Sequence, residues 1–323
     1  MDSNNSFQDI IDFFHANVTQ KNEEHTKNDD EIISLLNYFK ACEKFESEKS
    51  VYEICDELSY SSLRKLFNKE VSAIYVPNFV STRLCKRIFK NIESDLSSNI
   101  WENTDMFQGY GLPVNYMYGP TANECINYFS QLLPIIRKLR SISGGISPVD
   151  KLRLELDEIW PEGSTITNDN PFKRKAFVGL TRLMKPEGLV GNKTKKNGLV
   201  HIDGPLVRDS EVGTFSSNIY INTPYKGGEL CLWDISLTKN NRLKLEKLQK
   251  LLDYAFDKNY REDIQNLLQQ ILPSPIVIKP QIGDLILLNS CQPHSVMGFQ
   301  KGVRLSMQTF IYHENGKPLQ LYS

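Results

Sequence analysis

Two histidines and one aspartate in the second half of the chain have the residue types and spacing of a metal site. His201 and Asp203 stand one residue apart in the stretch NGLVHIDGPL, and His294 follows much later in NSCQPHSVMGF. Two imidazoles and one carboxylate on one face of an octahedral Fe(II) leave open positions, which a bidentate 2-oxoacid and O₂ can fill. The pattern therefore predicts a non-haem iron site formed by His201, Asp203 and His294.

A cation and a hydroxyl follow the second histidine on the next predicted strand. Arg304 stands ten residues after His294, and Ser306 stands two residues further on, so the two share one face of a strand. A guanidinium offers a planar fork to a carboxylate, and a hydroxyl adds a further donor. We expect Arg304 and Ser306 to hold the distal carboxylate of that 2-oxoacid cosubstrate. The alternative is that Arg304 is a surface arginine.

Alternation along a strand decides which of these side chains can meet. On a strand, His201 and Asp203 point to one face, and the apolar Ile202 between them points away. Without a metal, His201 would instead be a core histidine satisfied by Asp203 or by a backbone carbonyl. Asn218 and Tyr220 also share a face in SSNIYIN. Facing inward they would bind the cosubstrate or the substrate, and facing outward they would be ordinary surface residues.

Apolar periodicity predicts helices at the start of the chain and a strand after them. Residues 1–70 repeat apolar side chains at three- and four-residue spacing in DIIDFFHANV, DEIISLLNYFKACEKF and VYEICDELSYSSLRKLF, which is typical of amphipathic helices. Residues 71–80 are β-branched and aromatic and predict a strand. Ser81 is placed to cap a helix in STRLCKRIFKNIESDL, and residues 122–142 predict another helix.

The chain from residue 175 onward is predicted to be mostly strands. The β-rich stretches are short and end at Gly, Pro or Asn, which favours a barrel or a sandwich. They are AFVGLTRLMKP, GLVHIDG, TFSSNIYINTP, GGELCLWD, PIVIKP, GDLILLNS and VRLSMQTFIYH. Residues 241–272 interrupt them with a helical pattern that ends at Pro273 and Pro275, so we expect a helical insertion between two strands.

Composition and charge give no reason to expect a nucleic-acid or membrane partner. The 323 residues contain 38 Lys and Arg against 39 Asp and Glu, a formal net charge of −1, so there is no excess of basic residues to attract an anionic polymer. No stretch approaches the roughly 20 apolar residues that span a bilayer, and the polar start lacks the pattern of a signal peptide. The six cysteines form no C-x-x-C pair. We therefore expect reduced thiols in a cytoplasmic protein rather than a disulfide framework or a zinc site.

Taken together, the motif resembles that of the Fe(II)/2-oxoglutarate-dependent oxygenase superfamily. The family's His-x-Asp/Glu, its distal His and the Arg that follows are similar in order and spacing to His201, Asp203, His294 and Arg304. The stretches IYVPNFVSTRLCKRI, YKGGELCLWD and KPQIGDLILLNSCQPHSV resemble the prolyl-hydroxylase-like branch. The resemblance covers residues 71–313.

The resemblance implies an α+β fold, with a double-stranded β-helix (jelly-roll) core and N-terminal and inserted helices. On this basis we divide the chain into an N-terminal helical extension, residues 1–70, and an oxygenase domain, residues 71–323, with a helical insertion at 241–272. The extra helices resemble those by which members acting on small metabolites close their pockets.

For function, the resemblance implies an Fe(II)- and 2-oxoglutarate-dependent dioxygenase that uses O₂ and releases succinate and CO₂. Asp203 stands where the aliphatic halogenase branch has Gly or Ala, so oxygen transfer is expected: hydroxylation of an unactivated C–H bond. Desaturation or ring formation remains open. We expect a small-molecule substrate, such as an amino acid derivative or a natural-product intermediate. The alternatives are a protein or peptide hydroxylase of the prolyl type, and a catalytically inactive jelly-roll binding protein.

Candidate substrate contacts come from one loop and one strand. Residues 106–120 are rich in Gly, Pro and aromatic side chains, as in loops that line pockets, and Tyr116 and Tyr118 are the candidates there. A packed surface loop is the alternative. Arg182 would bind a substrate carboxylate or be a solvated sheet-edge residue. His313 is expected past the last strand and away from the iron.

Overall fold

The computed structural model describes residues 7–17, 29–47, 51–94, 101–103, 108–110, 121–168, 170–186, 198–204, 212–235, 242–255, 257 and 259–323. The helices within these ranges are α1 (Gln8–Asn17), α2 (Asp29–Lys40), α3 (Tyr60–Phe67), α4 (Thr82–Glu93), α5 (Ala122–Ser143), α6 (Pro148–Ile159), α7 (Arg242–Asp253) and α8 (Arg261–Ile271). The strands are β1 (Tyr52–Ile54), β2 (Ala73–Val76), β3 (Trp101–Asn103), β4 (Gln108–Tyr110), β5 (Ser164–Ile166), β6 (Leu180–Met184), β7 (Val212–Asn222), β8 (Leu230–Leu232), β9 (Ile276–Ile278), β10 (Leu285–Asn289), β11 (His294–Val296), β12 (Arg304–Glu314) and β13 (Leu319–Tyr322).

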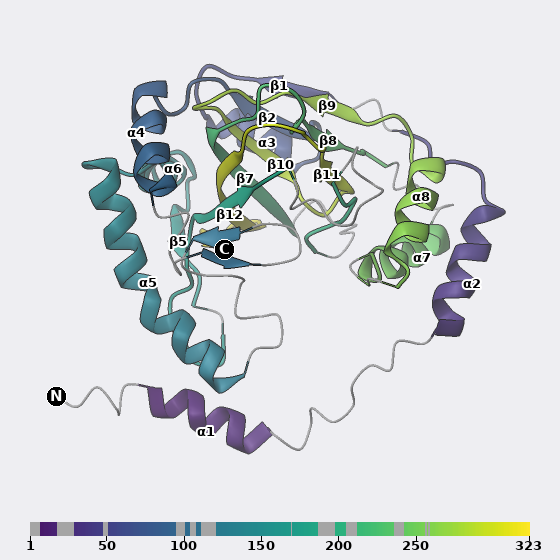
Figure 1. Ribbon diagram of the computed structural model, residues 1–323, viewed down its shortest axis with the longest axis horizontal. Helices are drawn as coiled ribbons and strands as arrows, with labels where there is room; N and C mark the ends of the chain where they lie inside the picture. The colour runs from purple at the N-terminus through teal and green to yellow at the C-terminus, as the bar shows by residue number, and fades with distance from the viewer. Residues whose placement is uncertain are drawn as a thin grey trace.

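The strands form a large and a small sheet, and the chain passes repeatedly between them (Figure 1). The large sheet has the order β1-β2-β10-β7-β12-β6-β4-β3, with β13 beside β12 and β5 beside β13. The small sheet has the order β11-β8-β9. From β6 onward the chain therefore alternates between the two sheets. The strands β6 and β7 belong to the large sheet, β8 and β9 to the small sheet, β10 to the large sheet, β11 to the small sheet and β12 to the large sheet.

The long strands β7 and β12 form the middle of the large sheet and separate its two faces. Met307 and Ile219 are opposite each other and belong to the apolar core on the outer face. The neighbouring Tyr220 packs instead with apolar residues of the small sheet. Since side chains alternate along a strand, Asn218 and its partner Gln308 lie on the inner face with Tyr220.

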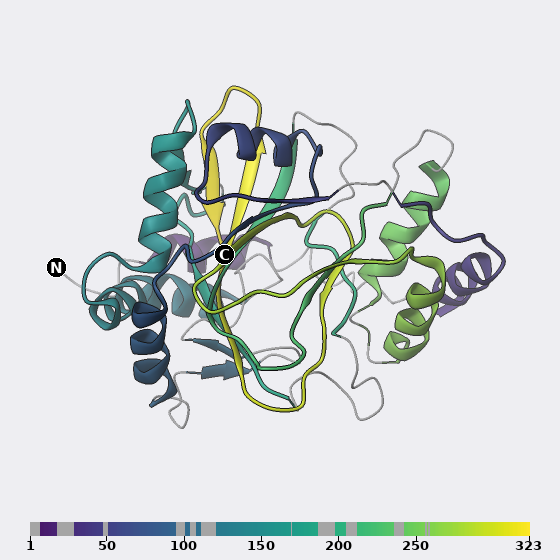
Figure 2. The same ribbon diagram turned by 90° about the horizontal axis from the view of Figure 1, so that it is seen from above.

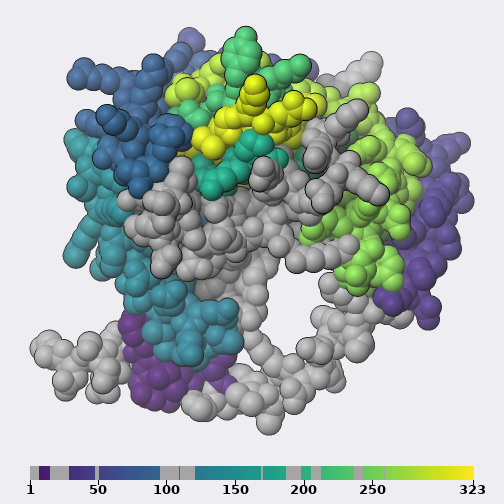
Figure 3. Space-filling view, viewed as in Figure 1, coloured from purple at the N-terminus to yellow at the C-terminus, as the bar shows by residue number. Residues whose placement is uncertain are grey.

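Helices cover the sheets on two sides (Figure 2). The helices α3 to α6 pack on the outer face of the large sheet through buried residues such as Ile88 and Leu132. A second group, which we call the helical annex, consists of α2, α7 and α8 and has its own core, in which Leu248 and Leu268 are fully buried. Burial of each such side chain contributes about 1.5–3 kcal/mol. In the space-filling view α1 lies against α5, and α2 lies against α7 and α8 (Figure 3).

The helix predictions of the first half are mostly confirmed. The Ser81 hydroxyl caps α4 by accepting the N–H of Leu84 at 3.3 Å, and the predicted helix at 122–142 is α5. The prediction of a single helix over residues 51–67 is wrong, because residues 52–54 form β1, which pairs in parallel with β2. That pairing is non-local and outweighs the apolar spacing. The helix α6 was not predicted.

In the second half the predicted strands other than GLVHIDG are present, and α7 and α8 lie between β8 and β9 as the expected insertion. His201 forms an isolated bridge rather than part of a longer strand. His313 does not lie past the last strand: it is a buried residue of β12, and β13 follows. Among the described residues, no helix has the length and apolarity to cross a membrane. The division at residue 70 stays a prediction.

Candidate metal centre

The segment that carries His201 runs beside the strand that carries His294. The N–H of His201 donates to the carbonyl of His294 at 3.0 Å, and the N–H of His294 donates to the carbonyl of His201 at 2.9 Å. One end of the segment is tied by Gly198, whose N–H donates to the Val296 carbonyl at 2.6 Å. A Cβ at Gly198 would lie 2.3 Å from that carbonyl oxygen, so this close approach requires glycine.

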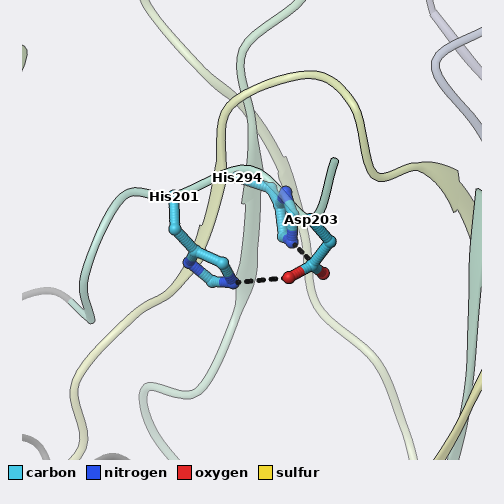
Figure 4. A group of neighbouring side chains, drawn as sticks. All are labelled: His201, Asp203 and His294. Atoms are coloured by element: carbon cyan, nitrogen blue, oxygen red, sulfur yellow. Dashed lines mark hydrogen bonds and ion pairs between the residues drawn. The ribbon is translucent and has the colours of Figure 1, made fainter. Parts of the chain in front are cut away.

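The side chains of His201, Asp203 and His294 converge on one point (Figure 4). The Nε2 atom of His201 lies 3.8 Å from one carboxylate oxygen of Asp203, and Nε2 of His294 lies 3.2 Å from the other. One candidate ligand atom from each residue lies within 4.8 Å of the other two. The side chains are 17%, 15% and 8% exposed, respectively, so a small ligand can reach the cluster although most of it is buried.

Backbone carbonyls orient both imidazoles for metal binding. Nδ1 of His201 lies 2.8 Å from the Leu199 carbonyl oxygen, and Nδ1 of His294 lies 2.9 Å from the Gln292 carbonyl oxygen. A carbonyl only accepts, so both Nδ1 atoms carry the hydrogen, and the Nε2 lone pairs are directed at Asp203. Two lone pairs facing a carboxylate are stable with a cation between them, and such outer hydrogen bonds are usual for metal-binding histidines.

The electrostatics of the cluster favour neutral imidazole beside ionised carboxylate. Burial, with the charge of His294, lowers the pKa of His201 to about 4 despite the opposing effect of Asp203. Burial alone would raise the pKa of Asp203, but the close contact with His294 and the electrostatic interactions with both histidines outweigh burial and lower that pKa below its ordinary value. At neutral pH the aspartate and His201 are therefore in the protonation states that a divalent metal requires.

The helical annex contacts the His201 segment on the side that faces away from the donor cluster. Gln265 of α8 is buried, its side-chain amide donates to the Val200 carbonyl at 3.1 Å, and its amide oxygen accepts the Val200 N–H at 2.8 Å. Ile202 packs against the annex core, as alternation predicted for the residue between the two metal-binding candidates. The two bonds from Gln265 imitate a neighbouring strand, so they fix the backbone next to His201. Gln265 is not predictable from the sequence, since no local pattern links it to Val200.

A buried guanidinium lies on the inner face of the large sheet. Arg304 is 5% exposed, and its terminal nitrogens contact the Tyr220 hydroxyl at 3.3 Å and the Met184 sulfur at 3.2 Å. Within the described part of the chain its Nε has no hydrogen-bond partner, and no carboxylate pairs with it. A buried charge without a counter-ion costs several kcal/mol, so this position is suited to an anionic ligand. The alternative that Arg304 is a surface residue is wrong.

The wall around Arg304 carries further polar side chains. Ser306 and Ser216 are fully buried and Gln308 is 4% exposed, and the two hydroxyls and the Gln308 amide oxygen have no hydrogen-bond partner among the described residues. Asn218 is 8% exposed and stands opposite Gln308. Gln308 and Ser216 were not among the predicted residues, although the period-two alternation through Arg304 and Ser306, and through Asn218, leads to both.

Arg182 lies on the same wall. It belongs to β6, which lies between β12 and β4, so the alternative of a sheet-edge residue is wrong. It stands directly opposite Ser306, and its charge lowers the pKa of both His201 and Asp203. The remaining substrate candidates, Tyr116 and Tyr118, lie outside the described residues.

The comparisons with known proteins concern the fold. No family model and no curated protein match the chain. It is similar to solved structures of an N-substituted L-amino acid dioxygenase from Burkholderia ambifaria (14% identity, 82% of this chain and 91% of that one, TM-score 0.49) and a prolyl-4-hydroxylase from Pseudomonas putida (12% identity, 79% and 100%, TM-score 0.35).

A third similar structure is the non-haem alpha-ketoglutarate-dependent epimerase SnoN from nogalamycin biosynthesis, at 11% identity, 79% and 87% coverage and a TM-score of 0.40. The three solved structures are thus a dioxygenase, a prolyl-4-hydroxylase and an alpha-ketoglutarate-dependent epimerase.

Proposed function

We propose that the protein is an Fe(II)- and 2-oxoglutarate-dependent dioxygenase. One observation supports this above others: a His, Asp, His donor set shares one interior with a buried arginine that has no carboxylate partner among the described residues. The donors suit a divalent metal with open positions, and the arginine suits the far carboxylate of a dicarboxylic acid bound to that metal. Neither feature alone requires the other, but one 2-oxoglutarate molecule would satisfy both.

In this proposal His201, Asp203 and His294 hold Fe(II). Arg304 binds the distal carboxylate of 2-oxoglutarate, and the Ser306 and Tyr220 hydroxyls add hydrogen bonds at the same end. Asn218, on the inner face beside them, contacts the middle of the cosubstrate. Bound there, the iron would supply O₂ activation coupled to conversion of 2-oxoglutarate into succinate and CO₂.

The protein itself contributes by holding the metal ligands in position and by excluding water from the inner wall. The backbone pairing of His201 with His294 and the Gln265 bonds hold the ligands in place before any metal arrives. The apolar side chains that pack around Tyr220 keep the inner wall dry, which strengthens each polar contact there. Positioning of one target C–H bond near the metal then determines which bond reacts.

The fold in this proposal is a double-stranded β-helix. The strand order supports this fold. In the large sheet β10, β7, β12 and β6 are neighbours, and in the small sheet the His201 segment, β11, β8 and β9 are neighbours. Along the chain the strands alternate between the two sheets. The proposal includes a cytoplasmic location, which the six free cysteines support.

The proposed reaction is hydroxylation of a small molecule, an amino acid derivative or a natural-product intermediate. The burial of the three donors favours a small substrate over a protein chain. A prolyl-type peptide hydroxylase would need an open groove leading to the same donors. A binding protein without catalysis would have no use for the complete donor set.

Anaerobic titration with Fe(II) and then 2-oxoglutarate tests the proposal, with the visible metal-to-ligand charge-transfer band as readout. We expect the band in the wild type and its loss in Asp203→Ala and His294→Ala. A matched control is His313→Gln, which changes a buried histidine on the outer face of the sheet and should keep the band. Absence of the band in folded, metal-loaded wild type would overturn the oxygenase proposal. The binding-protein alternative instead predicts that His294→Ala still retains its ligand.

A further inference from the structure

Two buried polar side chains of the inner wall have no role in the proposed binding of 2-oxoglutarate. The Ser216 hydroxyl and the side-chain amide oxygen of Gln308 have no hydrogen-bond partner among the described residues. Ser216 is fully buried, and Gln308 is 4% exposed. A buried polar group without a partner is destabilising, which suits a position where a ligand supplies that partner. We call these two residues the polar pair.

The polar pair consists of diagonal neighbours on adjacent strands. Gln308 of β12 stands opposite Asn218 of β7. Ser216 stands opposite Phe310, in the next inward-facing row. Diagonal neighbours in an antiparallel pair have Cβ atoms about 7–8 Å apart, a distance that long side chains can bridge. One ligand group with two polar atoms can therefore contact both residues.

The polar pair lies between Arg304 and the metal-binding donors. Gln308 follows Arg304 by four residues, which is about 13 Å along a strand, so a five-carbon diacid held at Arg304 extends no further than this row. Beyond the polar pair, β7 leads to Thr214, whose carbonyl accepts the Ser290 hydroxyl at 3.1 Å. The Ser290 carbonyl in turn accepts the N–H of Asp203 at 2.8 Å. The polar pair is thus at the end of the cosubstrate that is nearer the metal, where a substrate must lie.

The register partners of the polar pair on both sides are uncharged. They are Leu180, Asn218, Leu288 and Phe310. The Phe310 ring also lies 5.4 Å from that of Tyr322, which places an aromatic surface beside Ser216. None of these partners supplies a charge with which an ionic ligand group could pair, so the polar pair favours a neutral group.

The hydrogen-bonding capacity of the polar pair narrows the choice further. A side-chain amide offers an acceptor oxygen and donor hydrogens side by side, and a hydroxyl can donate or accept. A carboxylate only accepts and would leave the Gln308 oxygen unpaired, and an ester likewise has no N–H. An amide has an N–H for the Gln308 oxygen and a carbonyl for the Ser216 hydroxyl, so it complements both residues.

We infer that Gln308 and Ser216 bind an amide group of the substrate, so that this site acts on small amides, either N-acylated amines or carboxamides. The inference rests on the proposed function and names its substrate class. The amide would be fixed at its two polar atoms, with the apolar part of the molecule against Phe310. The reacting carbon would then lie on the side of the molecule that faces the metal.

The test uses a panel of small secondary amides, each paired with the ester in which oxygen replaces the N–H, added to the anaerobic Fe(II)/2-oxoglutarate complex. The readouts are perturbation of the charge-transfer band and, after admission of air, succinate release. In the wild type we expect at least one amide to act at a concentration about tenfold or more below that of its ester. Gln308→Met should abolish this preference and leave the 2-oxoglutarate affinity unchanged.

Ser216 has a matched control in its neighbour Ser217. Both are fully buried on β7, but Ser217 faces the outer side, and its hydroxyl donates to the Thr309 carbonyl at 3.1 Å. Ser216→Ala should weaken the action of the effective amides without lowering the melting temperature of the metal-free protein, since its hydroxyl has no partner among the described residues. Ser217→Ala should lower that melting temperature and keep the preference for amides.

Esters as effective as amides, or no effective amide while the band forms, would overturn the inference and leave the proposed function standing. A weaker 2-oxoglutarate affinity in Gln308→Met would assign Gln308 to the cosubstrate and overturn the inference equally. An equal fall in melting temperature in Ser216→Ala and Ser217→Ala would give the Ser216 hydroxyl a structural role and also overturn it. Absence of the band in the wild type would instead count against the proposed function itself.

Discussion

His201 and His294 donate backbone hydrogen bonds to each other's carbonyl oxygens, at 3.0 and 2.9 Å, and their rings lie 4.3 Å apart. The separation of the two imidazoles is therefore determined by a pair of adjacent backbones rather than by flexible side chains. A site held in this way is formed before its ligand arrives and loses little entropy on binding.

Metal binding should raise the thermal stability of the protein, because Fe(II) binds the folded chain alone. At a free concentration one hundredfold above the Kd, the expected gain is about 2.7 kcal/mol. Anaerobic thermal unfolding with and without Fe(II) measures it. The gain should disappear in Asp203→Ala and in His294→Ala, and an undiminished gain in either variant would place the metal elsewhere.

Replacement of Arg304 should weaken 2-oxoglutarate binding without loss of Fe(II). Removal of a charge-assisted, bidentate contact costs about 1.5–3 kcal/mol, which is on the order of tenfold to a hundredfold in Kd. We expect that loss in Arg304→Met and a smaller one in Arg304→Lys, since an ammonium keeps the charge but not the fork. The charge-transfer band, titrated with 2-oxoglutarate at saturating Fe(II), gives both affinities. An unchanged affinity in Arg304→Met would show that another group holds the carboxylate.

Gln265 should act as a positioning residue for His201. Gln265→Leu keeps the volume but removes both bonds to Val200, which leaves a buried N–H and carbonyl unpaired at a cost of about 1–3 kcal/mol each. We expect lower stability together with Fe(II) affinity reduced about tenfold. Gln249→Leu, on the exposed side of α7, is the control. A Gln265 variant that loses stability but binds Fe(II) as tightly as the wild type would limit the residue to a purely structural role.

His313 should make the protein less stable in acid. It is 4% exposed, stacks on Phe67 at 4.4 Å and contacts the Trp160 ring edge-on at 5.3 Å. Burial, with the charge of Arg64, lowers the pKa of His313 to about 4, although Glu162 and Glu314 act in the opposite direction.

The lowered pKa of His313 determines the direction in which stability changes with pH. The unfolded chain binds the proton near pH 6.5 and the folded chain only near pH 4, so the stability is complete above pH 6.5 and is lost as the pH falls towards 4. Between pH 7 and pH 5 His313 lowers the free energy of unfolding by on the order of 2 kcal/mol. His313→Phe should remove this loss and keep the aromatic packing. Denaturant unfolding of the wild type and of His313→Phe at both pH values measures the free energy of unfolding. An equal change in this free energy between the two pH values in both proteins would contradict the assignment to His313.

The sequence alone determined which side chains share a face. Alternation is a property of the local backbone, so Arg304 with Ser306, and Asn218 with Tyr220, were placed correctly on one face of a strand before any tertiary structure was known. His201 and Asp203 do meet, but around an isolated bridge rather than along a regular strand. The turn residues that end short β-rich stretches likewise predicted most strands, and Ser81 predicted the start of α4. These features depend on neighbours a few residues apart.

The tertiary structure decided what those faces meet. The pairing of β1 with β2 turned part of a predicted helix into a strand. The pairing of β12 with β7 at His313, with the rings of Phe67 and Trp160 against it, placed that histidine inside the molecule. The burial of Arg304 and the bonds from Gln265 to Val200 join residues far apart in the chain. Such contacts arise only when the sheets and the helical annex pack, because desolvation and non-local pairing depend on the whole fold and leave no periodic mark in the sequence.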